Sequence, residues 1–176
     1  DVNQAKNKII ETFEQKGIGK KKVKYRIRDW CASRQRYWGC PIPIIYREDG
    51  EILTVNEEDL PIELPLDVDF SKKGNPLDNH PTWKYTVCKK TGLKAIRETD
   101  TLDTFFDSAW YYYRFVNNTA EAPFDSSDID KWCPVHQYVG GIEHAVLHLL
   151  YARFFTKALK KTKKLKISEP FKGLFC

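Results

Sequence analysis

Residues 135–160 constrain the fold more than any other part of the sequence. A short apolar run at residues 135–139 follows Pro134 and predicts a strand, and Gly140 and Gly141 then lead into a pattern typical of a long helix over residues 142–160. A strand, a glycine-bearing turn and a helix form the local arrangement of a nucleotide-binding α/β fold. We therefore expect an α/β domain with a ligand near the glycine pair.

Periodicity indicates the remaining elements. It predicts an amphipathic helix over residues 2–13, a strand or extended segment at 22–28, and an edge or irregular strand at 41–46, where Pro41 and Pro43 limit pairing. Residues 49–81 are acidic and proline-rich, and we expect a peripheral insertion there, closed by a hairpin at 83–96. An aromatic stripe predicts one helix over 102–113.

Two features of this stripe leave its role open. Phe105, Trp110 and Tyr113 would be core residues in most proteins, and the spacing alone favours core packing. Ser108 and Tyr111 lie at the edge of the stripe, where a hydroxyl and an aromatic ring can shape a pocket for an apolar ligand.

The glycine turn is the best candidate for ligand binding. Glycines let a ligand approach the backbone, a helix N-terminus offers free N–H groups, and Glu143 can accept hydrogen bonds there. His144 and His148 are four residues apart and are expected on one helix face. They can be a metal pair, two substrate contacts, or two histidines satisfied within the fold. A metal site needs further ligands, and no His-Glu-x-x-His pattern is present.

Charge is segregated along the chain. Residues 16–36 hold nine basic residues against the single acid Asp29, whereas residues 48–69 hold nine acids and no Lys or Arg. A third, basic block covers residues 157–166, and such blocks can steer a polyanion or form a solvated face. Arg34 and Arg36 stand among aromatic residues, as on nucleic-acid surfaces, although stacking on Tyr37 or Trp38 explains them equally.

Composition limits the class of protein. The hydrophobic content of 41% and the aromatic content of 14% predict a globular chain, and no apolar run is long enough to span a membrane. Five cysteines without a disulfide-framework spacing suit a reducing compartment, so we expect a cytoplasmic protein. Because the chain begins with Asp1 and contains no methionine, we expect it to be part of a longer protein.

Three blocks resemble, in order, blocks of the bacterial-type leucyl-tRNA synthetases. They read RDWCASRQRYWGCPIP at residues 28–43, ETDTLDTFFDSAWYYYRF at 98–115 and YVGGIEHAVLHLLYARFFTK at 138–157. Isoleucyl and valyl relatives share versions of the first block and of the start of the second, whereas the third follows the leucyl pattern. The resemblance covers nearly the whole chain and implies the second half of a Rossmann-like class I catalytic domain.

The resemblance also implies roles for residues. Phe105, Ser108, Tyr111, His144 and His148 match the leucine and adenylate pocket, which revises the aromatic stripe toward a pocket wall; Gly140, Gly141 and Glu143 match the ATP site, and Arg34 and Arg36 match a segment near the tRNA end. The implied reaction joins leucine to ATP, with Mg²⁺, and then transfers the leucyl group to tRNA(Leu). No catalytic residue is assigned within these residues.

Departures from the family matter equally. The HIGH and KMSKS signatures are missing, so the expected partners include the rest of the synthetase chain, with its HIGH half, editing domain, KMSKS region and anticodon-binding region. We therefore expect the chain alone to be inactive. Many relatives carry a zinc ribbon with two Cys-x-x-Cys pairs, but here residues 47–50 and 88–91 retain only Cys88, so no metal is expected.

This comparison predicts three parts. Residues 1–46 lead from the editing insertion into the core, residues 47–97 form a metal-free, zinc-ribbon-like β insertion, and residues 98–176 form the C-terminal half of the Rossmann-like core. Two alternatives are a stand-alone RNA-binding module and a fragment of an isoleucyl or valyl enzyme. An incomplete sheet would leave apolar surface open, from which we expect poor stability or self-association.

Overall fold

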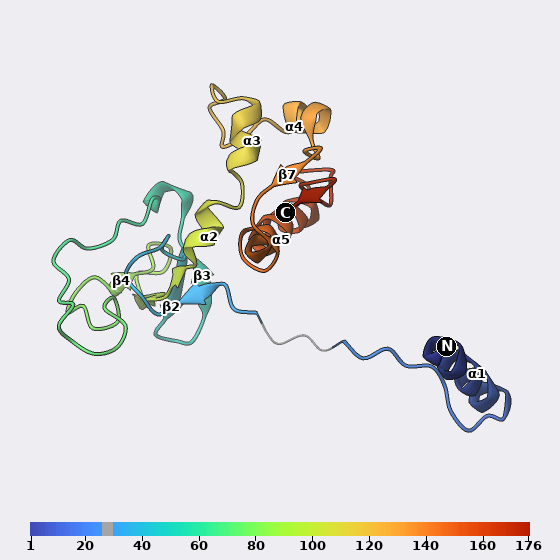
Figure 1. Cartoon of the computed structure of the whole chain (residues 1–176). Coiled ribbons are helices and arrows are strands. Elements are labelled where there is room, and N and C mark those ends of the chain that lie inside the picture. The colour runs from blue at the N-terminus through green and yellow to red at the C-terminus, as the bar shows by residue number, and fades with distance from the viewer. Residues whose placement is uncertain (26–29) are drawn as a thin grey trace. The chain divides into compact units, whose positions relative to one another are not determined.

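The computed structural model describes residues 1–25 and 30–176, which divide into two units, Asp1–Trp30 and Cys31–Cys176 (Figure 1). The predicted division at residues 46 and 97 remains a prediction. Among the described residues, no helix is both long and apolar enough to cross a membrane.

The first unit contains the helix predicted from its apolar spacing, α1 (Val2–Gln15). Asp1 caps its N-terminus by accepting a hydrogen bond from the Asn3 amide at 3.1 Å, and Gly17, with a φ of 66°, ends it in the left-handed conformation. Residues 19–25 form neither helix nor strand, so the alternating segment is not a strand as far as Tyr25, and its remainder lies outside the described residues.

A four-stranded antiparallel sheet dominates the first part of the second unit. Its order is β3 (Ile52–Thr54), β2 (Ile44–Arg47), β5 (Lys94–Arg97) and β4 (Tyr85–Val87) (Figure 1). The predicted hairpin is confirmed as β4 and β5. Of the two possibilities predicted for residues 41–46, the edge strand is wrong, because β2 begins at Ile44, after both prolines, and pairs on both sides. Residues 41–43 are irregular, with one isolated bridge from Pro41 to Thr101.

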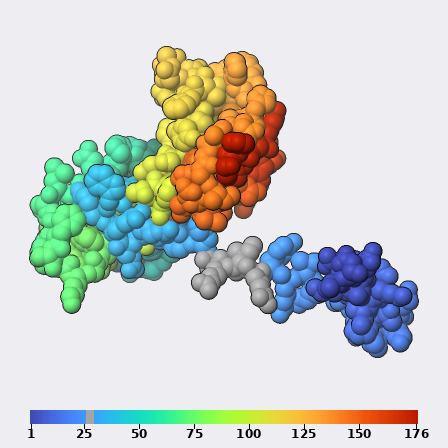
Figure 2. Space-filling model, in the orientation of Figure 1, coloured from blue at the N-terminus to red at the C-terminus, as the bar shows by residue number. Residues whose placement is uncertain are grey.

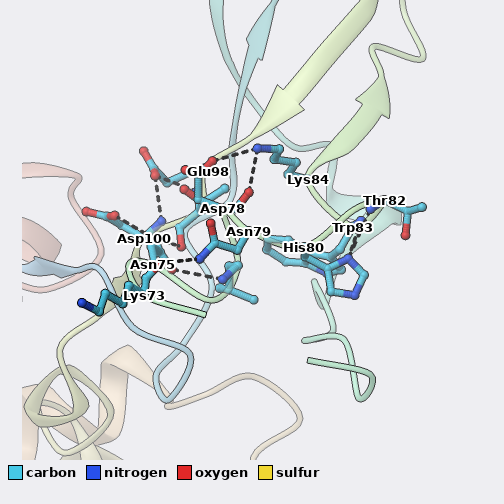
Figure 3. Close-up of polar contacts among 12 residues, drawn as sticks. Lys73, Asn75, Asp78, Asn79, His80, Thr82, Trp83, Lys84, Glu98 and Asp100 are labelled. Atoms are coloured by element: carbon cyan, nitrogen blue, oxygen red, sulfur yellow. Dashed lines mark hydrogen bonds and ion pairs between the residues drawn. The ribbon is translucent and has the colours of Figure 1, made fainter. Parts of the chain in front are cut away.

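Side chains organise the irregular segment between β3 and β4, where the only helical turn is η1 (Glu57–Asp59). His80 is 5% exposed, and its Nδ1 accepts hydrogen bonds from the amides of Trp83 at 2.9 Å and Thr82 at 3.3 Å (Figure 3). The remaining nitrogen, Nε2, lies 3.1 Å from an Asp67 carboxylate oxygen, so the proton of the neutral ring belongs on Nε2. These contacts replace the hydrogen bonds of regular structure.

The single helix predicted over residues 102–113 is wrong. Leu102 belongs to β6 (Thr101–Leu102), which pairs with β1 (Ser33–Arg34). Two short helices follow, α2 (Thr104–Asp107) and α3 (Tyr111–Val116). Asp103 caps α2 through the Phe105 amide, and Trp110, at φ −142° and ψ 0°, separates the two helices.

The last part contains α4 (Ser126–Trp132), β7 (Tyr138–Val139), the 3₁₀ turn η2 (Ile142–Ala145), α5 (His148–Lys161) and β8 (Leu174–Phe175). The predicted order of strand, glycine pair and helix is confirmed as β7, Gly140–Gly141 and α5, with η2 between the glycines and the helix. β8 then pairs in parallel with β7 and completes a β–α–β arrangement. The strand predicted at residues 135–139 shortens to β7 and a bridge at Val135, and the long helix begins at His148 rather than Ile142.

One core joins the helices of this part. Tyr112, Tyr113, Ile129, Ala152 and Leu165 are buried together, and the segments that carry them pack as one mass, coloured yellow to red in Figure 2. The Tyr113 hydroxyl meets Thr156 Oγ1 at 2.7 Å and thus ties α3 to α5. This contact fixes Tyr111, the first residue of α3, relative to the start of α5.

Candidate active site

His148 stands at the centre of an aromatic cluster at the start of α5. It is 5% exposed and stacks on Tyr111, with ring centroids 5.6 Å apart and planes inclined by 27°. Tyr138 and Phe171 flank it at 5.5 and 6.4 Å. Among the described residues, neither ring nitrogen of His148 has a hydrogen-bond partner. Burial and the neighbouring His144 lower the pKa of His148, so the ring is neutral at pH 7 and retains one donor and one acceptor.

Phe105 and His144 extend this cluster. The Phe105 ring lies 6.4 Å from that of His144 and 6.3 Å from that of Tyr151, and the two histidine rings are 6.2 Å apart. The histidines therefore meet as the spacing predicted, although they belong to η2 and α5 and not to one continuous helix. The structure brings together Phe105, Tyr111, His144 and His148; their roles toward a ligand stay predictions.

Ser108 and Glu143 differ from these four residues. Both are exposed, Ser108 directly after the last residue of α2 and Glu143 within η2, and no described side-chain contact joins either to the cluster. Glu143 instead folds over Gly141, where an added Cβ would lie 2.1 Å from its carboxylate. At Gly140 an added Cβ would lie 2.8 Å from the Tyr138 ring. The glycines thus permit close approach, but the free amides of the long helix begin at His148, so the predicted helix N-terminus at the glycine pair is wrong.

Asp103 organises the two arginines of the first block, a role that sequence reasoning missed. Arg34 Nε lies 2.9 Å and Arg36 Nη2 lies 3.5 Å from the same Asp103 oxygen. Arg34 also donates to the Tyr151 hydroxyl at 3.2 Å. Because the other Asp103 oxygen caps α2 at Phe105, the arginines and the aromatic cluster share one support. The signal available in the sequence was an Asp directly before a helical pattern.

Asp100 joins segments that are far apart in the sequence, and Figure 3 shows it beside Asn75 of the insertion. One of its carboxylate oxygens accepts from Ser33 Oγ at 2.9 Å, and the other lies 3.5 Å from Asn75 Nδ2. The same Asn75 amide group donates to the Thr99 carbonyl at 2.9 Å. The irregular insertion is therefore attached to the β1 segment that carries Arg34.

The positions at which the resemblance implies a zinc ribbon hold charged side chains. Arg47 pairs with Asp49 and Glu51, and the Arg47 hydrogen bond lowers the pKa of Asp49 to about 2. Thr91 and, to a smaller extent, Arg47 lower the pKa of the Cys88 thiol. Within the described ranges, no three His, Cys, Asp or Glu residues are grouped as metal ligands. A metal-free ribbon stays a prediction.

A β–α–β arrangement with a glycine-bearing turn is typical of nucleotide-binding α/β folds, and the aromatic cluster lies beside that turn. The family model of tRNA synthetases class I (I, L, M and V) matches residues 3–176, and the chain belongs to this family.

Individual relatives are leucine-specific by name. The chain is 56% identical over 174 residues to "Leucine--tRNA ligase" of Rickettsia bellii, covering 99% of this chain and 21% of that protein. Against the protein of the same name from Parvibaculum lavamentivorans it is 56% identical over 175 residues, covering 99% of this chain and 20% of the relative. The chain thus spans about a fifth of the length of these curated relatives.

A solved structure shows the same fold. It is the ternary complex of the Agrobacterium radiobacter K84 agnB2 LeuRS with tRNA and LeuAMS, with a TM-score of 0.79 and 42% identity over 98% of this chain and 22% of that one.

Proposed function

We propose that this chain forms part of a leucine–tRNA ligase, which activates leucine with ATP and transfers the leucyl group to tRNA(Leu). The observation that carries the proposal is His148, a buried neutral imidazole whose two nitrogens have no partner among the described residues, set in an aromatic wall. Buried polar groups are normally hydrogen-bonded, so a free pair in a cluster indicates a ligand. The leucine-specific relatives indicate which ligand.

In this proposal Phe105 and Tyr111 form the apolar wall for the leucine side chain, and His144 and His148 hydrogen-bond the amino acid or its adenylate. Ser108 completes the wall from the break after α2. The chemistry requires mainly that two substrates are positioned and that charge at the reacting phosphorus is offset. An apolar wall distinguishes one methylene by only about 1–3 kcal/mol, so it selects leucine with limited discrimination.

Gly140, Gly141 and Glu143 are proposed to hold the ATP ribose. For this, the Glu143 carboxylate moves from Gly141 to the ligand, which its exposed position permits. The family uses ATP, and Mg²⁺ accompanies ATP through its phosphate oxygens. The described acidic residues form no cluster that would hold the ion by themselves.

Arg34 and Arg36 have different parts toward the tRNA end. The Arg34 guanidinium pairs with Asp103 and donates hydrogen bonds to the Tyr151 hydroxyl and to the carbonyls of Cys31 and Ser33. Arg34 therefore supports the structure of the β1 segment. Arg36 has its Nε buried without a hydrogen-bond partner among the described residues, and its side chain is 42% exposed. Arg36 is therefore the proposed phosphate contact.

The test uses the full-length protein and leucine-dependent ATP–pyrophosphate exchange. We expect His148→Ala to lower kcat/KM for leucine at least about tenfold, the loss of roughly 1.4 kcal/mol of transition-state binding. His136→Ala is the matched control, because His136 makes none of the ring contacts of the cluster, and it should retain wild-type exchange. Unchanged exchange in His148→Ala contradicts the proposal. The 176 residues alone should show no exchange, and activity above background in a pure sample refutes that expectation.

A further inference from the structure

The basic block at residues 157–166 contains six lysines, and the structure divides them into two kinds. Lys157 Nζ lies 2.7 Å from a Glu169 oxygen, and Lys166 pairs with Asp130. The other four are exposed, and no acidic side chain of the described residues pairs with them: Lys160, Lys161, Lys163 and Lys164. We call these four the lysine turn.

At one of these four lysines the backbone adopts an unfavourable conformation. After α5 ends at Lys161, Lys163 adopts a φ of 61°, in the left-handed region where glycine is usual. The Lys164 amide donates to the Leu159 carbonyl at 2.8 Å, and Leu165, 4% exposed, anchors the turn in the core. A side chain in this conformation costs roughly 1 kcal/mol relative to glycine. The sequence therefore keeps a cation where an uncharged glycine would be more stable.

A hollow lies beside the turn. Its volume is about 360 Å³, and it is lined by the hydroxyl residues Ser126 and Ser127, by Asp130 and by residues 163–166. Ser126 Oγ donates to the Lys164 carbonyl at 2.9 Å, which ties the start of α4 to the turn. The one carboxylate in the lining is neutralised by Lys166. Ser127 Oγ likewise donates within the protein, to an Asp125 carboxylate oxygen at 2.6 Å, so the lysine ammonium groups are the donors that this small hollow offers to a phosphate group.

The favourable interaction between lysines and the C-terminal end of α5 explains only two of the four lysines in the lysine turn. Lysines in the last turn of a helix stabilise it through the helix dipole, which explains Lys160 and Lys161. Lys163 and Lys164 lie beyond the helix, where that effect ends. A ligand with several negative charges explains all four.

We propose that the lysine turn binds the phosphodiester backbone of RNA without reading its sequence. This rests on the proposed function, which supplies tRNA as the polyanion. Lysine is a point charge that attracts phosphate, and the four exposed residues offer no aromatic ring for stacking on a base. The contact contributes affinity and orientation, separate from the aromatic cluster where leucine is activated.

The experiment compares two double variants of the full-length protein, each of which replaces one pair of lysines and so removes two positive charges. Both are titrated with tRNA(Leu) at several salt concentrations. Lys161→Gln with Lys164→Gln removes two free lysines, and Lys157→Gln with Lys166→Gln removes the two paired ones. We expect the first pair to weaken binding several-fold and to reduce the slope of log K against log salt by about 1.5, since each phosphate contact contributes about 0.7–0.9. The second pair should change the slope much less. Equal effects of both pairs, or an unchanged slope, overturn the proposal.

Lys163→Gly separates binding from folding. Glycine relieves the left-handed backbone, so the variant should unfold at a higher temperature yet bind tRNA more weakly. Higher stability with unchanged binding means a solvated face and overturns the proposal. Poly-glutamate bound with the same lysine dependence as tRNA also overturns it. Leucine-dependent pyrophosphate exchange, measured without tRNA, should remain at the wild-type level in every variant; its absence from the wild type instead refutes the proposed function.

Discussion

The hydrogen bond between Tyr113 and Thr156 can be tested quantitatively. Both side chains have 0% exposure, and their oxygens lie 2.7 Å apart. Thr156 donates its single hydroxyl proton to the Ala152 carbonyl at 2.8 Å. Tyr113 must therefore donate to Thr156, which fixes the direction of the bond.

Thr156→Val keeps the shape of the side chain and removes the acceptor. The Tyr113 hydroxyl is then buried without this partner, and we expect a loss of about 1–3 kcal/mol in the free energy of unfolding. Tyr113→Phe removes the donor, while Thr156 retains its bond to Ala152, so the expected loss is about 1 kcal/mol. The double variant contains no orphaned hydroxyl. Its loss should be smaller than the sum of the two by about 1 kcal/mol.

Urea unfolding of the four proteins, followed by circular dichroism, measures this coupling. Equal m-values would show that all four lose the same structure. Losses that add to within about 0.3 kcal/mol would refute the reasoning, because independent sites behave in that way. A Thr156→Val protein as stable as the wild type would do so as well.

Three further predictions concern charge and metal. Arg153, with a smaller effect from Lys157, lowers the pKa of Glu169 from 4.5 to about 2, so its stabilising contribution is present above pH 4.5 and is lost as the pH falls toward 2. Glu169→Gln should accordingly flatten the dependence of stability on pH in that window, and an unchanged profile would contradict this. Asp103→Asn should weaken tRNA charging more than leucine activation in the full-length protein, since Arg34 loses its ion pair, and equal losses in both assays would argue against that support. Elemental analysis of the purified chain should find no stoichiometric zinc, because Cys88 is the one thiol at the ribbon positions; one zinc per chain would overturn this.

Local patterns predicted elements whose hydrogen bonds are local. The first helix and the β4–β5 hairpin follow directly from spacing and turn residues. The aromatic stripe did not, because a helical period of apolar residues persists through a capping Asp103 and a break at Trp110. Apolar periodicity shows only which residues face a core. Two short helices packed against one core give the same apolar pattern as a single helix.

The candidate site shows the same limit. His144 and His148 meet although the predicted continuous helix is broken at Val146 and Leu147, because η2 and α5 keep their rings 6.2 Å apart. Spacing alone did not show that Tyr111 stacks on His148 whereas Ser108 is exposed and makes no described side-chain contact with the cluster. Their separation depends on the turn between α2 and α3, and that turn depends on contacts made elsewhere in the chain.

The two aspartates of the second block explain how distant segments become one site. Asp100 holds Ser33 and the insertion through Asn75, while Asp103 holds Arg34 and caps the helix that carries Phe105. Ser33 and Arg34 are consecutive residues of β1, so the insertion and the aromatic cluster are attached to the same strand. β1 and β6 pair over two residues, and Thr101 Oγ1 donates to the Arg36 carbonyl at 3.0 Å, so the Asp103 carboxylate and these bonds together set the position of the arginines. A shift in the insertion would therefore reach the proposed tRNA-binding segment before it reaches the leucine pocket.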